Sequence, residues 1–140
     1  MPRAVVDVNV LVSALLHTDG TPVQVVRSWL AGAFELIVSE RLLVEFAQVI
    51  ERPRLARRID PLAVDALVAA LQVEGLLIED PPAERVVEAD PNDDYLIALA
   101  RAGGGAHAIV TGDSHLLELE GLDPPALTPR AFLAWLERIG

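Results

Sequence analysis

The sequence predicts an α/β protein with a mostly parallel sheet of about five strands. Short runs rich in Val, Ile and Leu alternate with longer segments of helical periodicity along the chain. The first run, 4–8 (AVVDV), has the β-branched character of a strand buried on both faces, which is typical of parallel sheets. The chain has 140 residues and shows no linker or internal repeat, so we expect a single domain over residues 1–140.

Capping residues, prolines and glycines delimit the first two helices that we expect. Asn9 can cap a short helix that ends at Leu16, directly after the first strand. Thr21 and Pro22 suit the N-cap and the first helical position of the next helix, and Gly32 is placed to end it.

The second strand is expected at 34–38, because this apolar run follows a glycine and precedes a capping residue. That capping residue, Ser39, begins a helix over 40–51, which must stop before Pro53. An Asp-Pro pair then opens a further helix over 60–73, and a glycine follows its end.

The second half of the chain continues the alternation. A third strand at 76–78 precedes a loop at 79–89 that is rich in proline and acidic residues. Asp-Pro opens a helix over 90–102, and three glycines follow it before the fourth strand at 107–111. The remaining elements are a short helix, a short strand and a last helix that Thr-Pro begins, over 114–119, 126–127 and 129–140.

The composition excludes several classes of chemistry. With 21 acidic and 11 basic residues the net charge is −10, which argues against binding of duplex DNA by massed positive charge. It does not exclude a nuclease, because acidic residues that bind a metal ion also lower the net charge. All basic residues are Arg, and Cys is absent, so catalysis by lysine or thiol, disulfides and Cys-zinc sites are excluded. No apolar run is long enough to span a membrane, and Asp7 and Asn9 interrupt the one signal-like run, so we expect a cytoplasmic protein without a membrane partner.

Two aspartates follow predicted strands. Asp7 interrupts an apolar strand, where an ionised carboxylate is costly unless it is paired or binds a metal ion. It either ends the strand and bonds a helix N-terminus, or it belongs to a site at the carboxyl end of a parallel strand. Asp113 follows the fourth strand and Gly112, and it can serve the same site or cap the next helix. Thr111 can donate its hydroxyl to a neighbouring carboxylate or merely fill the strand.

Three aspartates gather at the start of the helix expected over 90–102. Asp90 suits the N-cap and Asp93 suits a capping box, so neither needs a functional explanation. Asp94 is not needed for capping and shares a helix face with Ile97 and Ala98, which we expect to meet the sheet. Asp94 is therefore the best ligand candidate of the three.

The remaining candidates are ambiguous from the pattern alone. Glu45 falls on the polar stripe of its helix, where a solvated side chain paired with Arg41 is the simplest interpretation. The three histidines form no zinc motif. One basic cluster either contacts phosphates or forms a solvated helix end, and its members are Arg52, Arg54, Arg57 and Arg58.

The order of these acidic residues resembles the PIN-domain family, and more narrowly its compact prokaryotic, VapC-like members linked to toxin–antitoxin systems. The resemblance runs from about residue 3 to residue 137. The segments that carry it are VVDVNVLVSALL, SERLLVEFAQVI, DPNDDYLIALARAGGGAHAIVTGD and LTPRAFLAWL, of which the third, with its Thr-Gly-Asp, is the most specific.

The resemblance implies a three-layer α/β/α fold whose parallel sheet has the strand order 3-2-1-4-5. It implies that four catalytic carboxylates converge at the C-terminal edge of that sheet: Asp7, Glu45, Asp94 and Asp113. Asp7, Asp94 and Asp113 would hold the metal ion. Supporting polar residues would be Asn9, Ser39, Asp93 and Thr111. One departure is His115, which stands where relatives often carry a second aspartate and which suits Mn²⁺ better than Mg²⁺.

The activity that the resemblance implies is Mg²⁺- or Mn²⁺-dependent endoribonuclease cleavage of single-stranded RNA, leaving 5′-phosphate and 3′-hydroxyl ends. The expected partners are the RNA, a cognate antitoxin protein and, as in many members, a second copy of the chain. The alternative is a catalytically decayed PIN fold that only binds RNA or protein. A phosphatase of the HAD type fits poorly, because the second acid of its opening motif and its lysine are missing.

Overall fold

The computed structural model describes residues 1–82, 91–102 and 105–139, with side chains described from Asp94 onward in the second range. Its sheet has five strands, all parallel, in the order β3-β2-β1-β4-β5, which confirms the predicted fold class. The strands are β1 (Arg3–Val6), β2 (Glu35–Val38), β3 (Leu76–Leu77), β4 (Ala108–Val110) and β5 (Ala126–Leu127).

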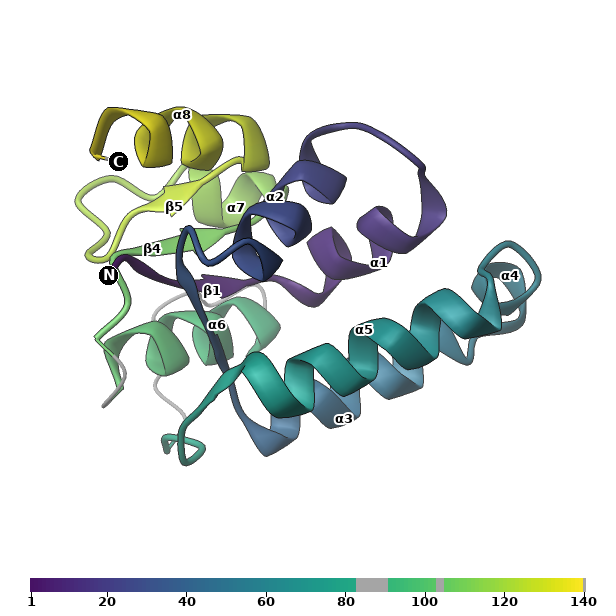
Figure 1. Cartoon of the computed structure of the whole chain (residues 1–140). Helices are drawn as coiled ribbons and strands as arrows, with labels where there is room; N and C mark the ends of the chain where they lie inside the picture. The colour runs from purple at the N-terminus through teal and green to yellow at the C-terminus, as the bar shows by residue number, and fades with distance from the viewer. Residues whose placement is uncertain (83–90, 103–104, 140) are drawn as a thin grey trace.

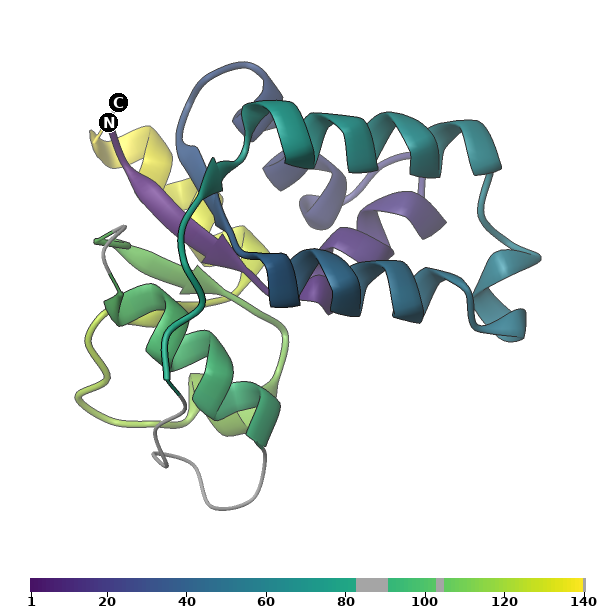
Figure 2. The same cartoon turned by 90° about the horizontal axis from the view of Figure 1, so that it is seen from below.

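Helices cover both faces of the sheet. The helices are α1 (Val8–Leu16), α2 (Thr21–Leu30), α3 (Glu40–Ile50), α4 (Pro53–Ala56), α5 (Pro61–Glu74), α6 (Pro91–Arg101), α7 (Ser114–Leu117) and α8 (Pro129–Ile139). Figure 1 shows α6 on one side of β1 and β4 and α8 with α2 on the other. Helices α3 and α5, connected through α4, extend away from the sheet, as Figures 1 and 2 both show.

The central strand is the most deeply buried part of the chain. Val5 of β1 pairs with Ile37 of β2 on one side and Ile109 of β4 on the other, and all three side chains are fully buried. Beside the sheet, Phe34 and Phe132 meet edge to face with ring centroids 4.9 Å apart. Apolar runs that are buried on both faces therefore fix β1 and β4 side by side, and their C-terminal ends meet at one edge.

The helix starts differ from the sequence prediction at two places. Helix α1 begins at Val8 with Asp7 as its N-cap, so Asn9 is not the cap and the first strand ends two residues early. The reason is that the Asp7 side chain already accepts the exposed N–H of Asn9. Helix α2 begins at Thr21 itself, after Gly20 at φ 108°, a conformation that favours glycine.

Two further features concern the middle of the chain. The short helix α4 was not expected, although a proline stands in its first turn. The expected end of α5 at Gly75 is confirmed, and this glycine is required because β2 packs directly against it. The helix start expected at Asp90 lies outside the described residues.

Candidate active site

Four polar side chains are buried in the described part of the chain, and they lie where strands meet helices. They are Asp7, Ser39, Asp94 and Thr111. Asp7 follows β1 and Thr111 follows β4. Ser39 caps α3 directly after β2, and Asp94 lies on α6, which packs against β1 and β4. Burial of polar groups is costly unless they form hydrogen bonds. Their concentration at this edge of the sheet therefore indicates a functional site.

Asp7 is held at both of its carboxylate oxygens. Its Oδ1 accepts the backbone N–H of Asn9 at 3.1 Å, and its Oδ2 accepts the Thr111 hydroxyl at 2.9 Å. The backbone N–H of Asp7 also donates to the carbonyl of Val110 in the neighbouring strand at 2.8 Å. Because only 8% of Asp7 is exposed, these bonds fix the direction of its carboxylate.

Asp113 is hydrogen-bonded to the same Thr111 hydroxyl as Asp7. Its backbone N–H donates to the Thr111 hydroxyl oxygen at 3.0 Å, so Thr111 bridges the two aspartates. Its own Oδ1 accepts the N–H of His115 at 2.9 Å, which caps α7, and the His115 imidazole Nδ1 lies 3.3 Å away. Capping therefore does not exclude a place in the site, and the predicted hydroxyl donation by Thr111 is confirmed in geometry.

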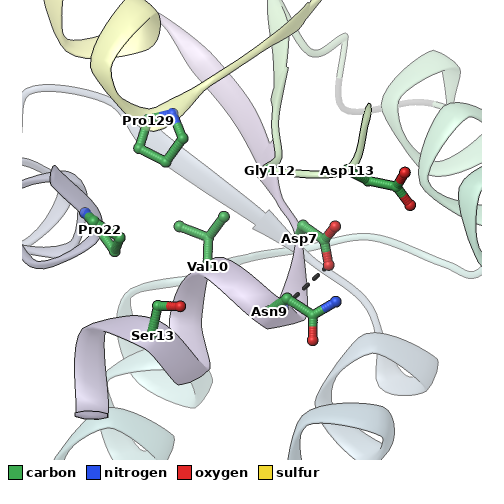
Figure 3. Close-up of a pocket in the computed structure, with 8 residues that line it drawn as sticks. All are labelled: Asp7, Asn9, Val10, Ser13, Pro22, Gly112, Asp113 and Pro129. Atoms are coloured by element: carbon green, nitrogen blue, oxygen red, sulfur yellow. Dashed lines mark hydrogen bonds between the residues drawn. The ribbon is translucent and has the colours of Figure 1, made fainter. Parts of the chain in front are cut away.

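The two aspartates open onto one pocket of about 370 Å³ (Figure 3). Their side chains lie at one end, and the other end is formed by α1 and by the first turns of α2 and α8. The lining residues are Asp7, Asn9, Val10, Ser13, Pro22, Gly112, Asp113 and Pro129.

Asp94 and Glu45 lie on helices that pack against the elements of this site, α6 on β1 and β4 and α3 on α1. Asp94 is buried on α6, together with Ile97 and Ala98, so the expected burial of this helix face is confirmed. Glu45 is half-buried on α3, which packs against α1. Neither is among the described residues that line the pocket.

The described coordinates contain no group of three His, Asp or Glu side chains arranged to hold a metal ion. Only Asp7 and Asp113 of the four predicted carboxylates share the pocket, so the convergence of all four stays a prediction. Asp90 and the Asp93 side chain lie outside the described residues.

A hydrogen-bond chain fixes the neighbouring helices α3 and α6 to the segment after β3. The Leu42 N–H donates to Ser39 Oγ, Ser39 bonds the Tyr95 hydroxyl, and that hydroxyl donates to Asp80 Oδ1 at 2.5 Å. The Arg41 guanidinium lies over the Tyr95 ring, 4.0 Å from its centroid. The predicted supporting residue Ser39 thus caps α3 and joins it to α6.

This chain shifts two pKa values. Burial and the hydrogen bond to Asp80 raise the pKa of Tyr95 far above its ordinary value. Partial desolvation alone would raise the pKa of the exposed Asp80 as well, but the bonds from Tyr95 and Ser39 and from the Arg41 N–H outweigh it, so the pKa of Asp80 lies below its ordinary value. Both shifts favour a neutral phenol that donates to an ionised carboxylate.

A family comparison confirms the resemblance at the level of the PIN-domain family. The family described as PIN domain matches residues 3–115. The chain belongs to the PIN-domain family. PIN domains are generally nucleases, and such nucleases typically use divalent metal ions.

One solved structure shows the same fold. The chain is similar to the crystal structure of PAE2754 from Pyrobaculum aerophilum, with a TM-score of 0.64 and 18% identity, over 98% of this chain and 90% of that chain. At this identity the likeness shows the fold alone. A comparison with curated proteins gave no match.

The donor atoms of this PIN domain suit a hard cation. Asp7 and Asp113 both line the pocket, and their side chains carry carboxylate oxygens. Mg²⁺ and Mn²⁺ prefer such oxygen ligands. The residues present therefore fit such an ion.

The basic cluster lies apart from the carboxylates in this PIN domain. Arg52, Arg54, Arg57 and Arg58 are all exposed, in and around α4. Both views place α4 at the end of α3 and α5 that is away from the sheet (Figures 1 and 2). None of the four lines the carboxylate pocket.

Among the described residues, no helix is long and apolar enough to cross a membrane.

The sequence did not indicate the distant wall of the pocket or the partners of Tyr95. Ser13 lies four residues after Asn9 on α1, and that spacing could have suggested one shared helix face. Pro22 and Pro129 come from different helices, and Asp80 is far from Ser39 and Tyr95 along the chain. No local pattern could have brought these residues together.

Proposed function

We propose that this PIN domain is a metal-dependent endoribonuclease that hydrolyses single-stranded RNA and acts as the toxin of a type II toxin–antitoxin pair. The observation that supports catalysis is the buried Asp7, oriented by Asn9 and Thr111, which shares one pocket with Asp113 at the C-terminal edge of the sheet. Sites in α/β folds lie at this edge. The choice of RNA and the toxin role rest on the family motifs.

The chemistry follows from the charge of the site. Carboxylates that are held close together repel one another, so a divalent cation favours their ionised forms. Asp7, Asp113 and the buried Asp94 would hold Mg²⁺ or Mn²⁺, and Glu45 would either bind the ion through a water molecule or orient the nucleophile. The bound ion supplies a more acidic water and offsets the charge on the phosphate and the leaving oxygen. Thr111 keeps the Asp7 carboxylate in position by its hydroxyl.

The test is cleavage of a labelled single-stranded RNA with Mg²⁺ or Mn²⁺. We expect Asp7→Asn to lose at least about a hundredfold in rate, because a neutral amide cannot replace a charged ligand. Asp65→Asn is the matched control, since it makes the same charge change at an exposed position on α5. Equal rates for wild type and Asp7→Asn, or cleavage that survives EDTA, would reject the assignment.

The second candidate is a PIN fold that binds RNA or protein without cleaving it. The observation that favours it is His115, whose N–H and imidazole both lie against Asp113 Oδ1. Added Mn²⁺ separates the two functions. An ion at a hundred times its dissociation constant stabilises a folded site by about 2.7 kcal/mol, so an intact site raises the melting temperature in wild type and less in Asp7→Asn. A decayed site shows no such rise.

The proposed partners have separate tests. A cognate antitoxin would hold the nuclease inactive, and a small antitoxin-like reading frame beside the gene supports that role. Light scattering tests for the homodimer. The arginine cluster around α4 would contact RNA phosphates beyond the pocket, which makes RNA affinity depend on salt.

A further inference from the structure

The pocket beside Asp7 and Asp113 has two ends of different chemistry (Figure 3). The two carboxylates lie at one end. The other end is formed by the isopropyl group of Val10 and the rings of Pro22 and Pro129. It carries no charged side chain among the described lining residues, so it suits an uncharged group of a ligand.

We propose that this apolar end holds one unstacked nucleoside of the RNA, next to the phosphate that is cleaved. The proposal rests on the proposed nuclease function and extends it to the substrate. The wall would contact the base and ribose by apolar faces, with the Ser13 hydroxyl as a hydrogen-bonding group.

The charge of the pocket sets the orientation of the nucleotide. The carboxylates alone would repel a phosphate, but the cation of the proposed function, bound between them, attracts it to that end of the pocket. A neutral base meets no charge at the apolar end. The phosphate therefore faces Asp7 and Asp113, and the nucleoside faces Pro22 and Pro129. The opposite orientation would place the phosphate against apolar walls.

The size of the pocket limits what can enter. A volume of about 370 Å³ is near the lower end of the range for small-molecule pockets, roughly 300–1,000 Å³. This volume matches one nucleotide. A nucleotide in a duplex must break its base pair and its stacking to enter the pocket. This costs more free energy than the entry of a nucleotide from a single strand. The pocket thus favours single-stranded RNA.

The lining also implies weak discrimination among bases. Apart from the carboxylates, the polar side chains among the described lining residues are those of Asn9 and Ser13. Recognition by apolar faces tolerates every base, while discrimination needs several fixed hydrogen bonds. We expect homopolymers of the four bases to be cleaved at rates within a few-fold of one another.

The test fills the pocket at Ser13 without changing the carboxylates. Ser13→Leu places a larger side chain at the apolar end, and Ser13→Ala removes the hydroxyl while leaving the space open. Ser28→Leu is the matched control, because Ser28 is also half-buried on a helix but lines a different cavity, with Leu133 and Leu136. Thermal unfolding of each variant checks that it folds.

Steady-state cleavage is the first readout. We expect Ser13→Leu to raise KM for single-stranded RNA by about tenfold or more, in line with the loss of one base contact. Ser13→Ala, which removes only the hydroxyl, should raise KM by less than Ser13→Leu, and the control Ser28→Leu should change it by less than about threefold. Annealing the RNA to its complement should slow wild-type cleavage by about tenfold or more. If wild type cleaves RNA and folded Ser13→Leu keeps the wild-type KM, the nucleoside site is overturned while the nuclease function stands.

Binding without cleavage is the second readout. Adenosine and uridine 5′-monophosphates carry no phosphodiester bond, so they can be titrated with Mg²⁺ into isotope-labelled protein and followed by NMR. We expect shifts at Val10 and Ser13 in wild type. Ser13→Leu should abolish the shift at Val10, and Ser28→Leu should retain both shifts. If wild type cleaves no RNA but shows these shifts, the nuclease function fails and the nucleoside site stands. Absence of the shifts overturns the site.

Discussion

Removal of the Tyr95 hydroxyl tests whether the bond chain between α3 and α6 stabilises the fold. Tyr95→Phe keeps the ring under Arg41 but leaves Ser39 Oγ and Asp80 Oδ1 without the phenol. Ser39 is fully buried and loses one of its hydrogen-bond partners, and loss of a hydrogen bond at a buried polar group costs about 1–3 kcal/mol, whereas the loss at the exposed Asp80 is smaller. We expect the free energy of unfolding to fall by about 2 kcal/mol and the melting temperature by roughly 6 °C.

The assay is urea and thermal unfolding of a double-mutant cycle. Tyr95→Phe and Asp80→Ala are measured singly and together, and we expect a coupling energy of about 1 kcal/mol. Asp80→Asn is the control, because its amide oxygen can still accept from the Tyr95 hydroxyl. A Tyr95→Phe effect below about 0.5 kcal/mol, or strict additivity of the two changes, would refute the reasoning.

The pH dependence of this coupling has a defined sign. The folded pKa of Asp80 is lowered, so its contribution is fully present above the ordinary value of 3.8 and is lost as the pH falls through the folded pKa. The folded pKa of Tyr95 is raised, so its contribution is present below the ordinary value of 10.0 and is lost only as the pH rises through the folded pKa. Tyr95 is the one tyrosine of the chain, so its ultraviolet titration is unambiguous. Tyrosinate absorbance that appears in the folded protein near the ordinary value would contradict the buried bond.

Two further substitutions test the close packing around Gly75 and the two roles of Asp113, which caps α7 and lines the pocket. Gly75→Ala should destabilise the fold by at least about 2 kcal/mol, since the new methyl group would collide with the Leu71 carbonyl and lie 2.8 Å from a Val38 methyl. Gly112→Ala is its stability control, because nothing lies within 4 Å of the added atom, and equal stability losses would contradict the argument. Asp113→Ser should keep the unfolding free energy within about 0.5 kcal/mol, because serine also caps helices, but abolish RNA cleavage. Retained cleavage would mean that Asp113 only caps α7.

Much of the fold follows from local patterns in the sequence. The apolar run at β1 and the matching run at β4 predicted two strands buried on both faces, and the structure pairs them in parallel. Glycines, prolines and capping residues placed most helix ends. The start of α1 was predicted incorrectly because Asp7 and Asn9 are both good caps, and only the backbone geometry shows which side chain accepts the N–H.

The sequence could predict those site residues that directly follow a strand, because all parallel strands end at one edge of the sheet. Asp7 and Thr111 could be assigned to the same edge of the sheet before any coordinates, because parallel strands end on the same side. That their strands are neighbours was implied only by the resemblance to the PIN-domain family, and the structure pairs them. The position of Glu45 could not be derived in this way. Its helix packs beside α1 through apolar contacts, and the sequence pattern of α3 alone favoured a solvated side chain.

The sequence by itself therefore determined the order of the strands and of all helices but α4, and it placed Asp7 and Asp113 after two strands, because apolar runs and capping residues are patterns among near neighbours along the chain. Only the tertiary structure decided which distant side chains meet. Pro22 and Pro129 reach the pocket of Asp7 from two separate helices, and Asp80 reaches Tyr95 across the ends of β2 and β3. Such contacts depend on how whole elements pack, and packing is a property of the complete set of buried surfaces rather than of any one segment.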